Sequence, residues 1–152
     1  MPASPGVDPQ SLREARARAG LTQHGLARVI GVAGGERVSR WELGSSAPRP
    51  SQLVRLADAL GVGVGDLLVE APQDLRRLRL CAGLSAREVA DRAYLSLPTY
   101  VRWEAGHLAK IPSRNTLEPL ARALCCTLAE LEQAFVLARA PSGRCAGQEP
   151  ER

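Results

Sequence analysis

With 152 residues, 45% of them hydrophobic and 24% charged, the chain has the composition of an ordinary globular protein, long enough for one large core or two small ones. No stretch approaches the roughly 18 uninterrupted apolar residues of a membrane helix, and residues 1–10 lack the basic and apolar regions of a signal peptide. The composition therefore predicts a cytoplasmic protein without membrane contact. The net charge of +4, carried by 19 Arg and a single Lys among the cations, favours an anionic partner.

An internal repeat sets the domain count. The motif Arg-Trp-Glu-x-Gly occupies residues 40–44 and again 102–106, and Gly-Leu-Thr at 20–22 is matched by Gly-Leu-Ser at 83–85. A period of about sixty residues indicates a duplicated domain rather than a solenoid. The expected organisation is a disordered N-terminal arm at 1–10, a first domain at 11–70, a linker at 71–73, a second domain at 74–135 and a disordered C-terminal tail at 136–152.

Apolar residues recur with helical spacing through both copies, and no segment alternates with the period of two that a strand requires. The first copy is expected to hold five helices, which begin near Ser11, Thr22, Gly35, Ser51 and Asp66 and end near Ala19, Val29, Leu43, Leu60 and Val69. Ser11, Thr22 and Ser51 are the expected N-caps, because a short polar side chain can accept a hydrogen bond from a free amide of the first turn.

The second copy repeats this order of helices. Asp74 is expected to cap its first helix, and Ser85 with Glu88 has the spacing of a capping box at its second. Ser96 is expected to cap the third helix, a fourth covers about residues 116–124, and Thr127 opens a fifth that runs to about residue 134. Both copies are thus predicted to be all-helical.

Two helices joined by a short turn, inside a five-helix unit, form a known arrangement. Each copy resembles the helix-turn-helix domain of the Cro and phage-repressor type, the xenobiotic-response-element family. The resemblance rests on three motifs in order, Gly-Leu-Thr-Gln-x-x-Leu-Ala at 20–27, Val-Ser-Arg-Trp-Glu-x-Gly at 38–44 and Leu-Ala-x-Ala-Leu at 56–60, whose counterparts recur in the second copy. It implies an all-α fold of two tandem five-helix lambda-repressor-like domains.

The resemblance also implies that the third helix of each copy enters the major groove of double-stranded DNA. In the first copy the candidate DNA contacts are Thr22, Gln23, Gly34, Gly35, Glu36, Arg37 and Arg40. Arg40 matches a position that faces the groove, where an arginine pairs with guanine or contacts a phosphate. Gln23 matches a family glutamine that contacts the DNA backbone. The alternative is that Gln23 is a solvated side chain on the protein surface. The family pattern further implies two internal salt bridges, Arg16 with Glu42 and Arg79 with Glu104.

The second copy departs from the family pattern. Ala86 replaces the glutamine, Tyr94 takes the place of Gly31, and Leu97-Pro98 offers little hydrogen bonding to bases. Its candidate DNA contacts are Ser96, Thr99 and Arg102, with Arg87, Arg92 and Lys110 as further phosphate contacts. The second copy is therefore interpreted either as a weaker reader of DNA or as a domain that contacts a protein.

The leading hypothesis is a sequence-specific DNA-binding transcriptional regulator with no catalytic residues, cofactor or metal. The four cysteines show no C-x-x-C spacing, and His24 and His107 have no recurring nucleophile or carboxylate beside them. The alternative is a protein-interaction adaptor or antitoxin-like module whose second domain binds a partner through the apolar residues 95–98. Self-association into a homodimer is also left open. Enzymatic activity is the least favoured interpretation.

Overall fold

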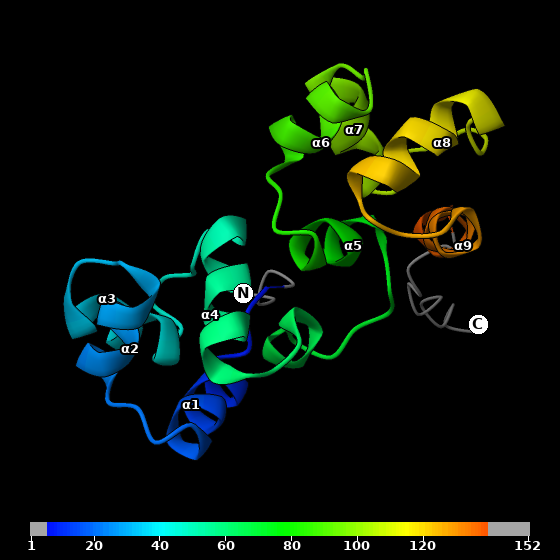
Figure 1. Cartoon of the computed structure of the whole chain (residues 1–152). Coiled ribbons are helices and arrows are strands. Elements are labelled where there is room, and N and C mark those ends of the chain that lie inside the picture. Colours follow the sequence, from blue (N-terminus) through cyan, green and yellow to red (C-terminus); the bar gives the residue numbers. More distant parts are fainter. Residues whose placement is uncertain (1–5, 140–152) are drawn as a thin grey trace, which may run out of the picture.

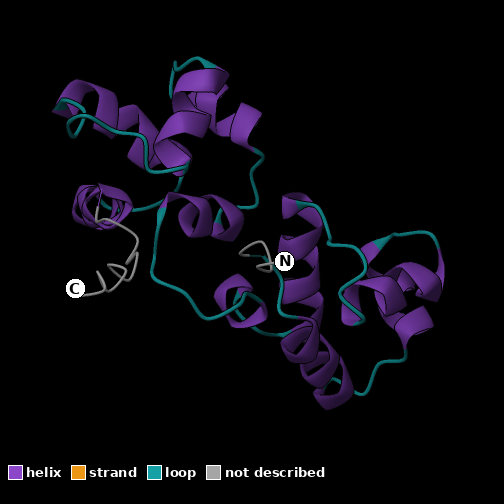
Figure 2. Cartoon of the chain, turned by 180° about the vertical axis from the view of Figure 1, so that it is seen from behind, coloured by secondary structure: helices purple, strands orange, loops and turns teal. Residues whose placement is uncertain are grey.

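The computed structural model describes residues 6–139, and this part of the chain is all-helical (Figures 1 and 2). The first unit consists of α1 (Pro9–Arg18), α2 (Gln23–Ile30), α3 (Gly34–Glu42), α4 (Pro50–Leu60) and a 3₁₀ helix, η1 (Val64–Leu67). The second consists of α5 (Leu75–Cys81), α6 (Ala86–Arg92), α7 (Leu97–Glu104), α8 (Arg114–Ala123) and α9 (Leu128–Arg139). The predicted all-α class with two five-helix units is confirmed.

Each unit has its own hydrophobic core. Buried side chains of the first core include Leu12, Leu26, Val38, Leu53 and Leu56. The equivalent set in the second core is Leu75, Val89, Tyr100, Leu120 and Phe135. Burial of these apolar side chains is the main driving force for packing five short helices together. None of the described helices combines the length and the apolar character needed to cross a bilayer.

Four of the expected N-caps are present. The side-chain oxygens of Thr22, Asp74, Ser85 and Ser96 accept hydrogen bonds from backbone amides in the first turn of α2, α5, α6 and α7. Glu88 closes the predicted capping box, because its carboxylate accepts from the Ser85 amide at 2.7 Å. These helix starts follow from local sequence alone, since each cap uses residues no more than three positions apart.

The start of α1 differs from the expectation. Asp8, not Ser11, caps this helix and accepts hydrogen bonds from the Gln10 and Ser11 amides at 3.3 and 3.2 Å. The Asp8 amide donates to the Leu67 carbonyl at 2.8 Å, and Val7 forms an isolated bridge with Leu68. Residues 6–10 therefore belong to the first domain, contrary to the predicted disordered arm, whose remaining residues 1–5 lie outside the described range.

Other boundaries also move. The expected cap Ser51 lies inside α4, which begins at Pro50 after Arg49, and the Gln52 side chain accepts from the Arg49 amide at 2.8 Å. A proline suits a first helical position because its missing N–H would have no partner there. η1 begins at Val64, earlier than expected, as Asp66 accepts from the Gly63 amide. Residues 136–139 of the predicted tail are helical in α9, and residues 140–152 are outside the described range.

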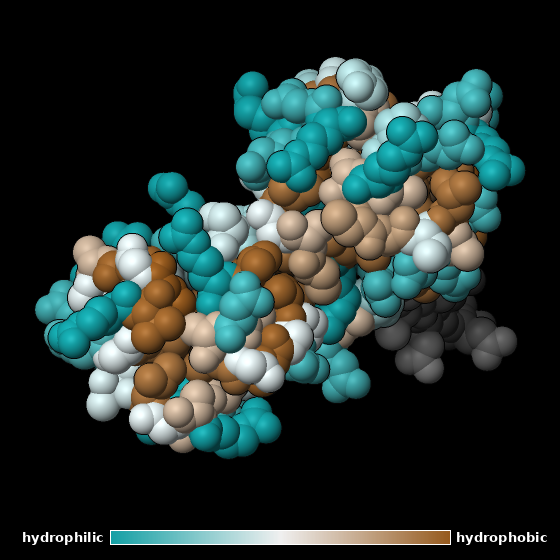
Figure 3. Space-filling view, viewed as in Figure 1, coloured by the Kyte–Doolittle hydropathy of each residue, from teal (hydrophilic) through white to brown (hydrophobic). Residues whose placement is uncertain are grey.

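The two domains are in direct contact through α5. This helix packs against its own domain and also against α4 and η1 of the first. Figure 1 shows α5 between the domains, with the α2–α3 pair and the α6–α7 pair each away from this junction. In Figure 3 the two domains meet without a gap, and apolar residues gather where α4 approaches α5. Both helix-turn-helix pairs are thus left uncovered by the other domain.

Candidate nucleic-acid interface

The turn between α2 and α3 depends on a left-handed residue. Gly31 follows α2 with φ of 71°, and Tyr94 occupies the matching position after α6 with φ of 56°. Glycine adopts this conformation without steric cost, whereas a residue with a side chain pays for it. The second copy therefore keeps the geometry of the turn and places an exposed tyrosine on it.

Gly35 lies at the closest approach of α3 to α2. It is buried, and a Cβ atom there would stand 2.5 Å from His24 Nδ1 and 2.9 Å from the His24 backbone nitrogen. The side on which a Cβ atom would stand therefore faces α2, and a DNA contact of Gly35 stays a prediction that only its backbone could fulfil. Gly34, which precedes it, is exposed with φ of 70° and has open space around it.

We expect Gly35→Ala to destabilise the first domain by about 1–3 kcal/mol, the usual cost of forcing extra atoms into a packed site. An ordinary glycine inside a helix shows the reverse effect, since alanine there stabilises by about 1 kcal/mol. Urea unfolding followed by circular dichroism measures the difference. A rise in stability would contradict the close approach of α2 and α3.

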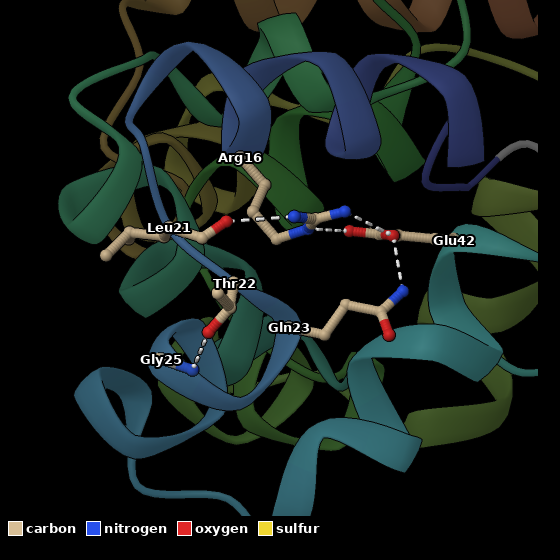
Figure 4. A network of polar contacts seen from close by, with 6 residues as sticks. All are labelled: Arg16, Leu21, Thr22, Gln23, Gly25 and Glu42. Atoms are coloured by element: carbon tan, nitrogen blue, oxygen red, sulfur yellow. Dashed lines mark hydrogen bonds and ion pairs between the residues drawn. The ribbon is translucent and has the colours of Figure 1, made fainter.

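A polar network joins α1, α2 and the end of α3 (Figure 4). Arg16 forms a two-pronged ion pair with Glu42, Nε to Oε1 and Nη2 to Oε2, and its Nη1 donates to the Leu21 carbonyl at 2.8 Å. Gln23 Nε2 donates to Glu42 Oε2 at 2.9 Å. Burial alone would raise the pKa of Glu42, but the hydrogen bonds from Arg16 and Gln23 outweigh it and leave the pKa lowered. The predicted Arg16–Glu42 salt bridge is present.

The second copy has only part of this network. Arg79 Nε and Nη2 both donate to Glu104 Oε1, at 3.1 and 2.8 Å, and Arg79 Nη1 donates to the Leu84 carbonyl. The predicted Arg79–Glu104 salt bridge is therefore present as well. Ala86 stands where Gln23 stands in the first copy, so no amide binds the second carboxylate oxygen.

Three arginines line one groove of the first domain. Arg37 and Arg40 come from α3 and Arg49 from the residue before α4, and Trp41 and Gln52 line the same groove. All three arginine side chains are exposed, and none forms an ion pair with a described residue. Uncompensated cations around a groove attract an anion. Arg49 was not predicted, because it is distant in sequence from α3 and only the fold of the α3–α4 turn brings it there.

The beginning of α3 adds free backbone donors. Its N-cap residue, Ala33, forms no side-chain hydrogen bond with the first turn, in contrast to Thr22 at α2. Amides without partners at a helix start favour negative charge. Glu36 is exposed in the same turn, so the surface presents one carboxylate among the arginines.

The corresponding groove of the second domain is less basic. It is lined by Thr99, Arg102, Lys110 and His107, among others, with Thr99 where the first domain has Arg37. Ser96 caps α7, and its hydroxyl lies 2.7 Å from that of Thr99, so both predicted contacts are engaged with each other. Arg102 is exposed and, among the described residues, has no ion-pair partner.

No metal centre accompanies these grooves in the described range, where no group of three or more His, Cys, Asp or Glu side chains is placed to hold an ion. Cys81, Cys125 and Cys126 are free thiols. Burial raises the pKa of Cys126 to about 11, which disfavours its reactive thiolate at neutral pH.

Comparison with known proteins agrees with this architecture. A family model described as a helix-turn-helix domain matches the chain twice, over residues 10–71 and 73–134. Comparisons with curated proteins and with solved structures each gave no match. The two matched segments cover most of the 152 residues and correspond to the two five-helix units. The chain therefore belongs to the helix-turn-helix domain family and carries two copies of the domain in tandem, of the Cro and phage-repressor type that its motifs resemble.

Proposed function

We propose that this chain is a sequence-specific DNA-binding regulator of transcription that acts in the cytoplasm and inserts α3 into the major groove of duplex DNA. The observation that carries the proposal is the groove lined by Arg37, Arg40 and Arg49 between α3 and the start of α4, on a helix whose own start has no side-chain cap. A helix-turn-helix domain presents this helix to base edges and its surroundings to the phosphate backbone. The exposed cations on and beside α3 support this proposal, because a phosphate backbone attracts them.

Each side chain has a distinct proposed role. Arg40 reads a guanine, because a guanidinium can bind its O6 and N7 together. Arg49 and Gln23 contact phosphates on the two sides of the DNA major groove. These contacts position α3 without reading the base sequence. The carboxylate of Glu42 holds Gln23 before DNA arrives, so less side-chain entropy is lost on binding.

A second function is supported for the second domain. Tyr94 is 89% exposed on the turn before α7, and Val101 is 47% exposed on α7 itself. Large exposed apolar side chains are enriched at protein contacts. We therefore retain a protein-binding role for this domain beside weaker DNA binding through Arg102.

Selection of bound duplexes from a random DNA pool tests the proposal, using the full chain at low salt. We expect one enriched motif. If three arginines neutralise three phosphates or fewer, the affinity falls by up to about 40-fold between 50 and 200 mM salt. Enrichment of no motif at low salt would overturn the proposed function. Binding to a protein partner without salt dependence would then favour the adaptor alternative.

A further inference from the structure

The helix α5 belongs to the second domain in sequence but packs on both domains. Its residues Leu75 and Leu78 are buried in the second core, whereas Leu80 packs against the core of the first domain. The same helix contacts α4 and η1. One short helix therefore carries apolar side chains into two cores at once.

Three residues of this segment, Arg77, Leu80 and Gly83, make the contact with the first domain, and we name them the α5 lock. Arg77 donates from Nη1 to the Val69 carbonyl at 2.8 Å and from Nη2 to the Gly65 carbonyl at 3.0 Å. Gly83 stands so close to α4 that a Cβ atom on it would lie 2.5 Å from Val54 Cγ2. Arg77 and Leu80, three residues apart, lie on one side of α5, and Gly83 follows just after the helix ends at Cys81.

The first copy shows what these positions look like without a neighbour. At an offset of 63 residues, Glu14, Ala17 and Gly20 take the places of the α5 lock. All three are exposed, and a Cβ atom on Gly20 would meet nothing within 4 Å. Because Gly20 and Gly83 share a φ of 71°, they differ only in the neighbouring domain. The junction thus uses two positions at which the residue types of the repeat differ, Arg77 and Leu80, and one glycine that both copies share.

We propose that the α5 lock holds the two helix-turn-helix domains as one rigid body and so sets the distance and angle between α3 and α7. The rigidity itself does not depend on DNA binding. Its consequence for DNA rests on the proposed function. A fixed pair of reading helices accepts two half-sites only at a matching separation and rotation.

This consequence is sharp because the duplex is helical. Each added base pair between two half-sites moves the second by about 3.4 Å along the axis and rotates it by about 35°. A flexible linker would absorb such steps, but a rigid junction cannot. The chain is therefore expected to discriminate strongly between spacers that differ by one base pair.

Residual dipolar couplings of the free full-length chain test the lock directly. In the wild type, one alignment tensor is expected to fit the amides of both domains. In the Arg77→Ala/Leu80→Ser variant, two different tensors are expected. The matched control is Glu14→Ala/Ala17→Ser at the equivalent exposed positions, which should keep the single tensor. A wild type that already needs two tensors overturns the lock.

A second pair of variants guards against misfolding of the first. Gly83→Ala and Gly20→Ala carry the same backbone strain, but only Gly83→Ala places a methyl group against Val54. Gly83→Ala is expected to require two alignment tensors, and Gly20→Ala to keep one. If both behave as wild type while Arg77→Ala/Leu80→Ser also keeps one tensor, the three residues are not the lock.

The DNA consequence is tested on two selected half-sites with spacers varied in steps of one base pair. The wild type should prefer one spacer by at least about 10-fold, and Arg77→Ala/Leu80→Ser should reduce this preference to about 2-fold while each half-site alone binds as before. Equal binding at all spacers, or a motif read by one domain alone, overturns this consequence. A single tensor in a chain that enriches no DNA would instead leave the lock intact and remove the proposed function.

Discussion

Arg40→Ala is expected to lower the affinity for the selected DNA site by about 5- to 150-fold. A two-pronged arginine–guanine contact contributes about 1–3 kcal/mol of discrimination, and each 1.4 kcal/mol is a factor of ten. Arg40 is suited to this contact because it is exposed in the last turn of α3, beside Arg37 and Arg49, and has no ion-pair partner in the described range. Fluorescence anisotropy with labelled duplex measures the loss.

The control for Arg40→Ala is Arg122→Ala. Arg122 is exposed at the end of α8 and lines neither basic groove. Its removal lowers the net charge by the same amount as Arg40→Ala but leaves the proposed contact of Arg40 with guanine in place. Loss of binding to all sequences alike in Arg40→Ala, with a salt dependence weaker by about one charge, would identify a phosphate contact instead of base reading. Arg102→Ala applies the same test to the second domain.

Glu42→Gln is expected to destabilise the first domain by about 3 kcal/mol at pH 7. Glu42 is 4% exposed and its partner Arg16 is 16% exposed, so the substitution leaves a guanidinium in the protein without its counter-charge. Removing one member of a buried pair costs about 3–5 kcal/mol, and the partial exposure of Arg16 places this case at the lower end. Urea unfolding of the wild type and the variant measures the difference.

The pH dependence of this difference follows from the lowered pKa of Glu42. A carboxylate whose folded pKa lies below its ordinary value of 4.5 contributes stability that is fully present above pH 4.5. That contribution is lost as the pH falls through the folded pKa. The gap between wild type and Glu42→Gln should therefore shrink below pH 4.5. A gap that stays constant from pH 7 to pH 3 would contradict the assignment.

Glu104→Gln provides the matched comparison in the second domain. Glu104 uses one carboxylate oxygen for Arg79, whereas Glu42 uses both oxygens and binds Gln23 in addition. The cost of Glu104→Gln is therefore expected to be smaller than that of Glu42→Gln. Equal costs would show that the Gln23 contact adds nothing to stability.

Glu42→Gln also affects the proposed DNA contact at Gln23. The amide of Gln23 is held by a charged acceptor, and a neutral glutamine at position 42 binds it less strongly. We expect DNA affinity to fall modestly in this variant even where the domain remains folded.

Much of the architecture was predictable from sequence because its signals are local. The caps at Thr22, Asp74, Ser85 and Ser96 act over at most three residues. The repeat indicated two domains, and the family motifs implied both partly buried salt bridges. The cap of α1 was mistaken because Asp8 is held by the distant Leu67 carbonyl, and a local reading of Ser11 cannot show that.

The sequence by itself determined the two helix-turn-helix units and the presence of an arginine in the third helix of each. Only the tertiary structure decided which of them share a surface. It buried Gly35 against His24, brought Arg49 beside Arg40, and joined Gln23 to Glu42. It also turned α5 into a junction at positions that are exposed in the first copy. The physical reason is that helix formation follows local spacing, whereas contacts between helices depend on packing of side chains far apart in the chain.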